Sequence, residues 1–250
     1  MCRMYVFIAC VCVFLAVGYS SYAKPYQPQV KGGYRHCMSI EYRAQDGKPM
    51  SKIGQNRDSL VIDEHGNQIE LISFSEGKLS QSNKIANRYN DKGQLSEATY
   101  YSADGKPVVT YAYTYDDNAN LVGESTKNSD GKVTAKANHK YDRANILIQT
   151  DYIIIEDGKE VVTNSDLYKN DNNGNMIVQT NVQANGSKMD VTYEYVYDKN
   201  KNITKLTRTS FDNYKFVKEF KYDRFGNIIE ELYPDDNGKI VMRVVYRFTN

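Results

Sequence analysis

Hydrophobic and polar residues alternate along much of the chain after residue 60, as they do in β-strands that bury one face. The alternation is clearest in residues 110–115 and 192–197, where every second residue is Tyr. We expect this tyrosine face to be the packed or inner one, because tyrosines stacked across strands bury large areas. No stretch shows an apolar period near 3.6 residues, so the pattern predicts an all-β protein.

An Asp or Asn recurs in this region at intervals of 25 to 29 residues, usually directly after a Tyr. An Asp at the start of a turn accepts hydrogen bonds from backbone amides two residues later. A Gly three positions on supplies the positive φ that a type I turn with a bulge requires, and Asn145 is expected to replace it in one copy. The residues of these repeat turns are predicted to be structural: Asp63, Gly66, Asn90, Gly93, Asp116, Asp142, Asp171, Gly174, Asp198, Asp223 and Gly226.

A second kind of turn lies between these repeat turns, marked by Asp-Gly or Asn-Gly pairs such as Asp104-Gly105 and Asp157-Gly158. These pairs are the strongest short-range hairpin signals, because both central residues of a type I′ turn adopt positive φ. The two kinds of turn alternate about every 13 residues, which predicts a meander of hairpins. Similar pairs stand at Asp46-Gly47, Glu76-Gly77, Asp130-Gly131, Asn185-Gly186 and Asn237-Gly238.

The predicted fold is an antiparallel meander of about 15 strands, built from hairpin repeats of 25 to 29 residues. Because twisted open sheets rarely exceed about 10 strands without curling, we expect an open spiral or partial shell. Residues 60–250 form one repeat domain, since no linker interrupts the period. Residues 24–59 hold prolines, paired glycines and half a repeat, which predicts a leader and a truncated N-terminal capping repeat.

Residues 1–23 have the features of a secretory signal peptide: one basic residue, a short apolar run and a small-x-small end at Ser21 and Ala23. Its removal takes away three of the four cysteines, so Cys37 is predicted to be a partly buried thiol without an intrachain disulfide. The remaining chain has 31 basic and 31 acidic residues. This balance gives no reason to expect a nucleic-acid partner, which would favour a basic excess.

The pattern Tyr-Asp-x-x-Gly-Asn followed by Leu or Ile, as in Tyr222–Ile228, resembles the YD repeat of Rhs and teneurin proteins. The resemblance covers about residues 60–250. In that family such repeats form a long antiparallel sheet that spirals into a hollow shell, and the resemblance implies a similar architecture here. The period is longer than is usual in the family, and after about seven copies we expect no self-cleavage segment and no toxin domain. The resemblance therefore implies a short exported bacterial member without toxin activity.

No catalytic or metal-binding constellation stands out in the sequence. His36, His65 and His139 lack the paired spacing of a zinc site. Glu230 and Glu231 are adjacent, so they point to opposite faces of a strand and cannot face each other as the carboxylate pair of a glycosidase. We therefore expect no enzymatic activity, no cofactor and no metal.

Tyrosines in the central repeats are the candidate ligand-binding residues, because exposed rings can stack on a neutral glycan or on a surface protein. Burial of the same rings inside the sheet is the competing interpretation. The candidates for ligand stacking are Tyr111, Tyr113, Tyr193 and Tyr195.

The sequence favours a non-enzymatic exported protein, in the periplasm or on the cell surface of a Gram-negative bacterium, that acts as a scaffold or an adhesion-type binding module. The mature chain is not expected to span a membrane. The alternative is an outer-membrane β-barrel, and a third hypothesis is a carbohydrate-active enzyme. The barrel is suggested by a C-terminal strand with one apolar face, although the polar strands elsewhere argue against it. That face is formed by Ile240, Met242, Val244, Tyr246 and Phe248.

Overall fold

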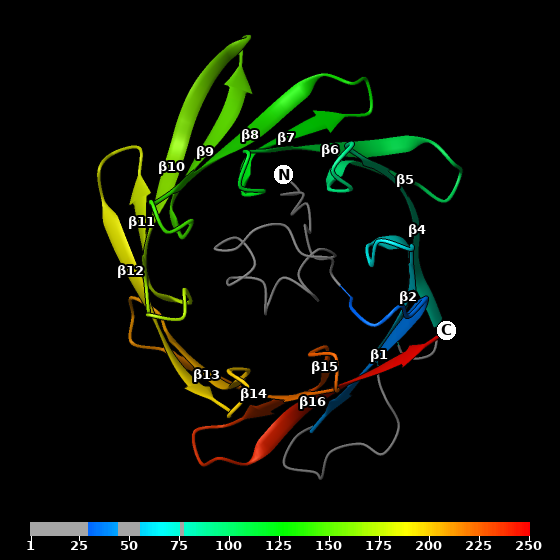
Figure 1. Ribbon diagram of the computed structural model, residues 1–250, viewed down its shortest axis with the longest axis vertical. Coiled ribbons are helices and arrows are strands. Elements are labelled where there is room, and N and C mark those ends of the chain that lie inside the picture. The colour runs from blue at the N-terminus through cyan, green and yellow to red at the C-terminus, as the bar shows by residue number, and fades with distance from the viewer. Residues whose placement is uncertain (1–29, 45–55, 76–77) are drawn as a thin grey trace, which may run out of the picture.

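The computed structural model describes residues 30–44, 56–75 and 78–250, and every regular element in these ranges is a β-strand. Sixteen strands form one antiparallel sheet that closes into a barrel (Figure 1). The predicted all-β meander is confirmed, but the predicted open spiral or partial shell is wrong, because the sheet closes on itself. The predicted signal peptide, the leader as far as residue 29, and the turns at Asp46-Gly47 and Glu76-Gly77 lie outside the described residues.

The first eight strands are β1 (His36–Arg43), β2 (Asn56–Ile62), β3 (Gln68–Ser75), β4 (Lys78–Tyr89), β5 (Leu95–Tyr101), β6 (Pro107–Tyr115), β7 (Leu121–Asn128) and β8 (Val133–Tyr141). The last eight are β9 (Leu147–Glu156), β10 (Lys159–Asn170), β11 (Met176–Gln183), β12 (Lys188–Tyr197), β13 (Ile203–Thr209), β14 (Lys215–Tyr222), β15 (Ile228–Pro234) and β16 (Ile240–Thr249).

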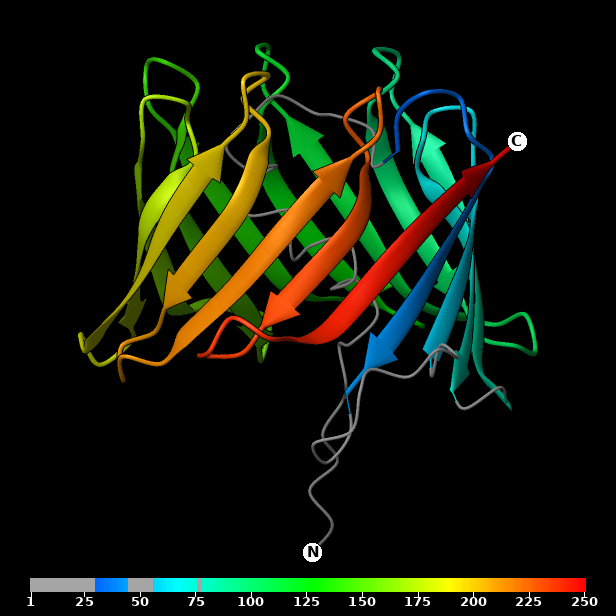
Figure 2. The ribbon, with the colours of Figure 1, turned by 90° about the horizontal axis from the view of Figure 1, so that it is seen from below.

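Closure comes from the ladder between the first and last strands. Strands β2 to β15 each pair with their two neighbours along the chain. Strand β1 pairs with β2 and also with β16, from His36–Thr249 to Arg43–Met242. An open sheet would expose unpaired backbone groups on both edge strands, and this ladder removes both edges. Figure 2 shows the strands inclined to the barrel axis, as closure of a sheet requires. The predicted capping repeat therefore contains the closing strand, β1.

The repeat turn occurs seven times at one end of the barrel, the upper end in Figure 2. In each copy the Asp or Asn side chain accepts hydrogen bonds from the backbone N–H groups two and four residues later. At Asp223 the donors are Phe225 and Asn227, at 2.8 and 2.9 Å. The residue three positions on always has positive φ: Gly66, Gly93, Ala119, Asn145, Gly174, Lys201 and Gly226.

The Tyr before a repeat turn ties that turn to the preceding repeat through its hydroxyl group. Tyr115 donates to the carbonyl oxygen of Leu95 over 2.8 Å. Tyr197 donates to the carboxylate of Asp171 in the preceding repeat turn over 2.6 Å. Comparable contacts to the preceding repeat are made by Tyr89, Tyr141 and Tyr222. The recurrence of Tyr thus has a structural cause, since each one joins neighbouring hairpins.

The turns at the opposite end differ from the prediction. Asp157-Gly158 is the one described pair in which both residues have positive φ, at 50° and 75°. In the turn at Ser102 only Gly105 has positive φ, its N–H donates to the Ser102 carbonyl, and the Ser102 N–H donates to that of Lys106. This is the geometry of the repeat turn. The expected type I′ turn is therefore wrong for most of these hairpins, because Gly at positive φ also suits a type I turn with a bulge.

The residues that lead into β1 show which face of the sheet is the inner one. They lie inside the ring in Figure 1, where Val30 joins a buried cluster with Cys37, Leu60 and Tyr246. Directly paired residues share a face, so the register carries this assignment from strand to strand. Cys37 is a buried free thiol with 1 % of its surface exposed, more buried than predicted.

Residues 30–34 also link two repeat turns on either side of the closing ladder. The Val30 N–H donates to the Gly66 carbonyl over 3.0 Å. The Asn227 amide pairs with the backbone of Lys31, accepting from its N–H over 2.9 Å and donating to its carbonyl over 2.8 Å. Tyr34 continues this contact with an edge-to-face approach to Phe225, with ring centroids 5.8 Å apart. The strand that closes the barrel is thus fixed at its entrance.

Candidate functional site

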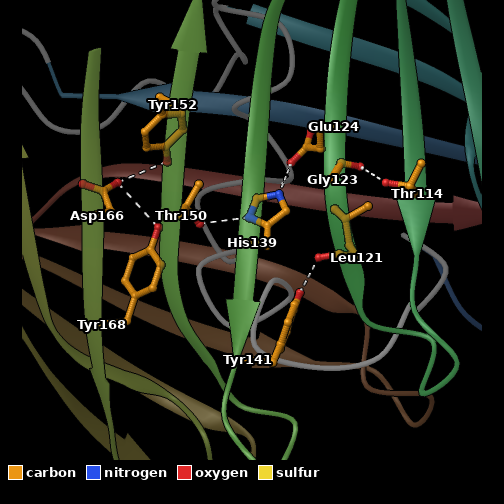
Figure 3. A network of polar contacts seen from close by, with 10 residues as sticks. All are labelled: Thr114, Leu121, Gly123, Glu124, His139, Tyr141, Thr150, Tyr152, Asp166 and Tyr168. Carbon is orange, nitrogen blue, oxygen red and sulfur yellow. Dashed lines mark hydrogen bonds and ion pairs between the residues drawn. The ribbon is translucent and has the colours of Figure 1, made fainter. Parts of the chain in front are cut away.

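A run of polar side chains follows the inner face of β7 to β11, where the register brings together residues from five strands. Figure 3 shows its members from β7 to β10. His139 of β8 faces Thr150 of β9, which in turn faces Asp166 of β10. Those of these groups that are buried need hydrogen bonds to satisfy them. We call this set the inner-wall polar cluster, and its members are Glu124, His139, Thr150, Tyr152, Asp166, Tyr168, Gln179 and Asn181.

His139 occupies one side of the cluster, with 7 % of its surface exposed. Its Nδ1 lies 2.9 Å from Thr150 Oγ1, and its Nε2 lies 3.0 Å from Glu124 Oε1. A hydroxyl, an imidazole and a carboxylate are the groups of a nucleophilic triad, but a nucleophile must be reachable by its substrate. Thr150 is 2 % exposed and is sealed into the wall. This arrangement therefore fixes side chains in the wall and does not present a nucleophile.

Asp166 occupies the other side of the cluster and is 4 % exposed. Its Oδ2 accepts hydrogen bonds from the Tyr152 hydroxyl at 3.1 Å and from the Gln179 amide at 2.9 Å, and it lies 3.5 Å from the Tyr168 hydroxyl. Its Oδ1 accepts from the Asn181 amide at 2.7 Å. A buried carboxylate is costly unless hydrogen bonds compensate it, and four uncharged donors supply that compensation here. The carboxylate in return fixes two tyrosines and two amides in one orientation.

Tyr152 is the exposed member of the cluster, with 37 % of its surface open. Burial of its hydroxyl raises its pKa, and the neighbouring Tyr168 and Asp166 raise it further. The phenol therefore stays protonated and continues to donate to Asp166. Its position gives the inner wall an aromatic surface held by a fixed hydrogen bond.

The predicted stacking tyrosines lie on the inner face, in two separate pairs. Tyr111 and Tyr113 belong to β6, whereas Tyr193 and Tyr195 belong to β12, six strands further along the sheet. Tyr193 is 4 % exposed, and its hydroxyl donates to Gln179 over 3.0 Å, which connects it to the inner-wall polar cluster. The structure does not bring the four side chains into one site.

Sequence reasoning did not select His139 or Asp166, although a signal was present. The repeat turn at Asp142 fixes the pairing of β8 with β9, so counting back from the bulge before this turn places His139 opposite Thr150. The pairing of β9 with β10 then places Asp166 beside them. Polar residues at inward positions of three successive strands are the feature that marks this wall.

The outer face carries charged residues in cross-strand ion pairs. Lys140 lies 3.0 Å from Asp151 on the neighbouring strand. Glu97 of β5 lies 3.4 Å from both Arg88 of β4 and Lys127 of β7. A further set joins β14 to β16 through Lys221, Glu230 and Arg243.

The apolar face of the last strand does not point outward, as a lipid-facing strand would. Val244 and Tyr246 are 8 % and 6 % exposed and belong to the buried cluster around Val30, with Phe248 packed against it. The apolar face of this strand therefore gives no support to an outer-membrane barrel, contrary to the prediction, because these side chains line the interior.

Across residues 30–44, 56–75 and 78–250, no three His, Cys, Asp or Glu side chains gather in a way that could hold a metal ion. Within these same ranges, no helix is long and apolar enough to cross a bilayer.

Comparison with known proteins relates this barrel to solved structures only. No protein-family model and no curated protein matches the chain. A porin-like protein from Bacteroides uniformis superimposes with a TM-score of 0.53 at 12 % identity, over 88 % of this chain and 99 % of the other. The two chains share a porin-like fold. At this identity the likeness concerns architecture and does not extend to activity.

Two other structures are more distant. A porin-like protein from Bacteroides vulgatus gives a TM-score of 0.43 at 12 % identity, over 86 % of this chain and 98 % of that one. A TcdB2–TccC3–Cdc42 complex gives 0.29 at 14 % identity, over 82 % of this chain and 14 % of that one. Scores below 0.5 support no structural argument.

Proposed function

We propose that this protein is a non-enzymatic exported barrel of the cell envelope, and that its inner wall binds a small polar solute. The observation that carries the proposal is the contrast between its two faces. The inner face holds tyrosines, a fixed set of hydrogen-bonding groups around Asp166 and one buried ion pair, Lys218–Glu231, whereas the ion pairs of the outer face have solvent-exposed lysines. Binding sites combine aromatic surface with a few oriented polar groups in this way.

The size of the barrel supports an interior that can admit a solute. Barrels of about eight strands are filled by their own side chains or hold one small ligand, and barrels of 16 to 18 strands enclose a water-filled space. With sixteen strands, this barrel belongs to the wide class. An aqueous interior would bring solutes to the exposed ring of Tyr152.

A pore in the outer membrane is the second candidate function. It is favoured by the closed sixteen-strand barrel and by the porin-like fold of its structural neighbour. A lipid-facing wall needs a continuous apolar band, and Lys or Arg near the bilayer midplane costs about 2–4 kcal/mol each. Lys136, which points outward from the middle of β8, favours a barrel surrounded by water over a membrane pore.

The resemblance to YD repeats is also part of this proposal. The repeated Tyr-to-preceding-turn contacts give the motif a structural role, which supports kinship with that class of repeat. An exported relative would reach the periplasm or the cell surface, as the N-terminal sequence predicts.

The two candidate functions make opposite predictions for a charge added to the outer wall. Thr192 lies in the middle of β12, is exposed and points outward, next to the inward-pointing Tyr193. In a barrel surrounded by water, Thr192→Arg should change the free energy of unfolding by less than about 0.5 kcal/mol. In a barrel surrounded by lipid, it should impair membrane assembly.

The test compares the full-length protein with its Thr192→Arg variant after expression in a Gram-negative host. Cell fractionation and flotation with lipid vesicles measure the membrane-bound share of each. Recovery of both proteins in the soluble envelope fraction, with equal melting temperatures, is the expected result. Integral association of the wild type with the outer membrane, lost in the variant, would replace this proposal with the pore. Tyr193→Arg is the matched control, and it should destabilise the barrel in either case because Tyr193 is buried.

A further inference from the structure

We infer that the solute bound by the inner wall is a neutral oligosaccharide, and that the Tyr152 ring is the surface on which a sugar stacks. This inference rests on the proposed function and specifies its ligand. Figure 3 shows the rings of Tyr152 and Tyr168 above and below the Asp166 carboxylate. The cluster therefore offers aromatic faces beside groups that exchange hydrogen bonds.

The Tyr152 ring is exposed enough to receive a sugar. A sugar ring presents a face of C–H groups that packs on an aromatic face, and such packing needs a ring that is open on one side. Tyr152 is 37 % exposed, whereas Tyr193 in the same wall is 4 % exposed. Tyr152 can therefore act as a platform, while Tyr193 serves to hold Gln179.

The amides beside Tyr152 are held in fixed orientations. Sugar hydroxyl groups both donate and accept hydrogen bonds, so they match side-chain amides and phenols, which do the same. Gln179 and Asn181 each donate to Asp166, over 2.9 and 2.7 Å, which fixes the plane of both amides beside the tyrosines. Groups held in this way lose little conformational freedom when a ligand binds.

The charges of the inner wall favour a neutral ligand over an ionic one. Glu124 and Asp166 are both carboxylates of this wall, and the inward-facing Arg208 lies on β13, two strands beyond β11, so an anion would meet like charge at the cluster. A cation would need the carboxylate oxygens of Asp166, and these already accept hydrogen bonds from Gln179 and Asn181. A neutral solute avoids both difficulties.

The experiment measures binding by isothermal titration calorimetry with the full-length protein. The neutral probes are cellohexaose, maltohexaose and xylohexaose; the charged probes are spermidine and a sulfated disaccharide. We expect one neutral probe to bind, and Tyr152→Ala to weaken it at least tenfold. Tyr168→Phe keeps the ring and should retain binding within about threefold, because stacking on Tyr152 supplies most of the affinity. Tyr101→Ala is the matched control on β5, where the register directs the side chain outward, and it should leave binding unchanged.

The outcomes separate this inference from the proposal on which it rests. Binding of a charged probe alone, weakened by Tyr152→Ala, would overturn the neutral-sugar inference and leave the solute-binding barrel in place. Binding of no probe of any class, with the barrel intact by circular dichroism, would count against both. Binding of a neutral sugar that Tyr152→Ala does not weaken would overturn the assigned platform.

Discussion

Gly226 offers a direct test of the repeat turn, because its substitution changes backbone strain without changing packing. Its φ is 85°, and a Cβ built on it would have no heavy atom within 4 Å. Any loss of stability in Gly226→Val therefore comes from forcing a β-branched residue into the left-handed region, where L-residues are disfavoured by about 1–2 kcal/mol. Because Val restricts the unfolded chain more than Gly does, the substitution also adds about 0.4–1 kcal/mol of stability. We expect a net loss of about 1 kcal/mol or more, since Val is poorly suited to this conformation.

The sequence itself supplies the controls for this experiment. Asn145 occupies the same position in another copy with φ of 59°, so Gly226→Asn should be tolerated better than Gly226→Val. Lys201 occupies it with φ of 65°, so Lys201→Gly should relieve strain and leave the barrel at least as stable as the wild type. The expected order of stability is therefore Lys201→Gly, at least equal to the wild type, then Gly226→Asn, then Gly226→Val.

The assay is unfolding in urea, followed by far-ultraviolet circular dichroism, together with thermal melts. For a chain of this size a loss of about 1 kcal/mol lowers the melting temperature by about 2–4 °C. Equal midpoints for Gly226→Val and the wild type would refute the reasoning. So would an Asn variant as unstable as the Val variant, because the effect would then not depend on tolerance of positive φ.

Three further predictions concern the segment that leads into β1, the carboxylates of the repeat turns and the Cys37 thiol. Asn227→Ala removes both hydrogen bonds to Lys31 and should destabilise the barrel by about 1–3 kcal/mol, with faster proteolysis near residue 31; unaltered cleavage would show that this contact does not hold the segment. Burial alone would raise the pKa of Asp171, but hydrogen bonds, first that from Tyr197, outweigh it and lower the pKa. Its stabilising contribution is therefore complete above the unfolded value of about 3.9 and is lost as pH falls through the lower folded pKa, so urea midpoints should drop below about pH 4 in the wild type and less in Tyr197→Phe. Cys37 should resist a thiol reagent in the native state and react in urea; rapid native labelling would contradict its burial.

The local structure was predictable from the sequence because its causes are local. Asp at the start of a repeat turn and Gly or Asn three residues later select a turn type through contacts within five residues. Ala119 and Lys201 adopt the same positive φ without any favourable residue type, because the flanking hairpin and the carboxylate of the turn fix the backbone. No propensity scale would have indicated them.

Closure and the inner-wall polar cluster were not predictable in the same way. Closure depends on the pairing of His36 with Thr249, which are more than two hundred residues apart and carry no local sign of each other. The cluster depends on the register of five strands, in which a bulge beside each repeat turn shifts the alternation by one residue. An assignment of faces that ignores these bulges places Asp166 and His139 incorrectly relative to the tyrosines.

Because the contacts join neighbouring repeats, the circumference of this barrel can change in steps of one hairpin. Each Tyr at a repeat turn bonds to the repeat before it, and the closing strand bonds to the last strand, so no copy depends on the total number of copies. Removal of residues 116–141 would join Tyr115 to Asp142, preserve the Tyr-Asp junction and take away two strands. Because barrel diameter increases roughly linearly with strand number, the loss or gain of one hairpin would narrow or widen the interior in a fixed increment. Duplication of short segments thus gives this architecture a direct route to interiors of different width.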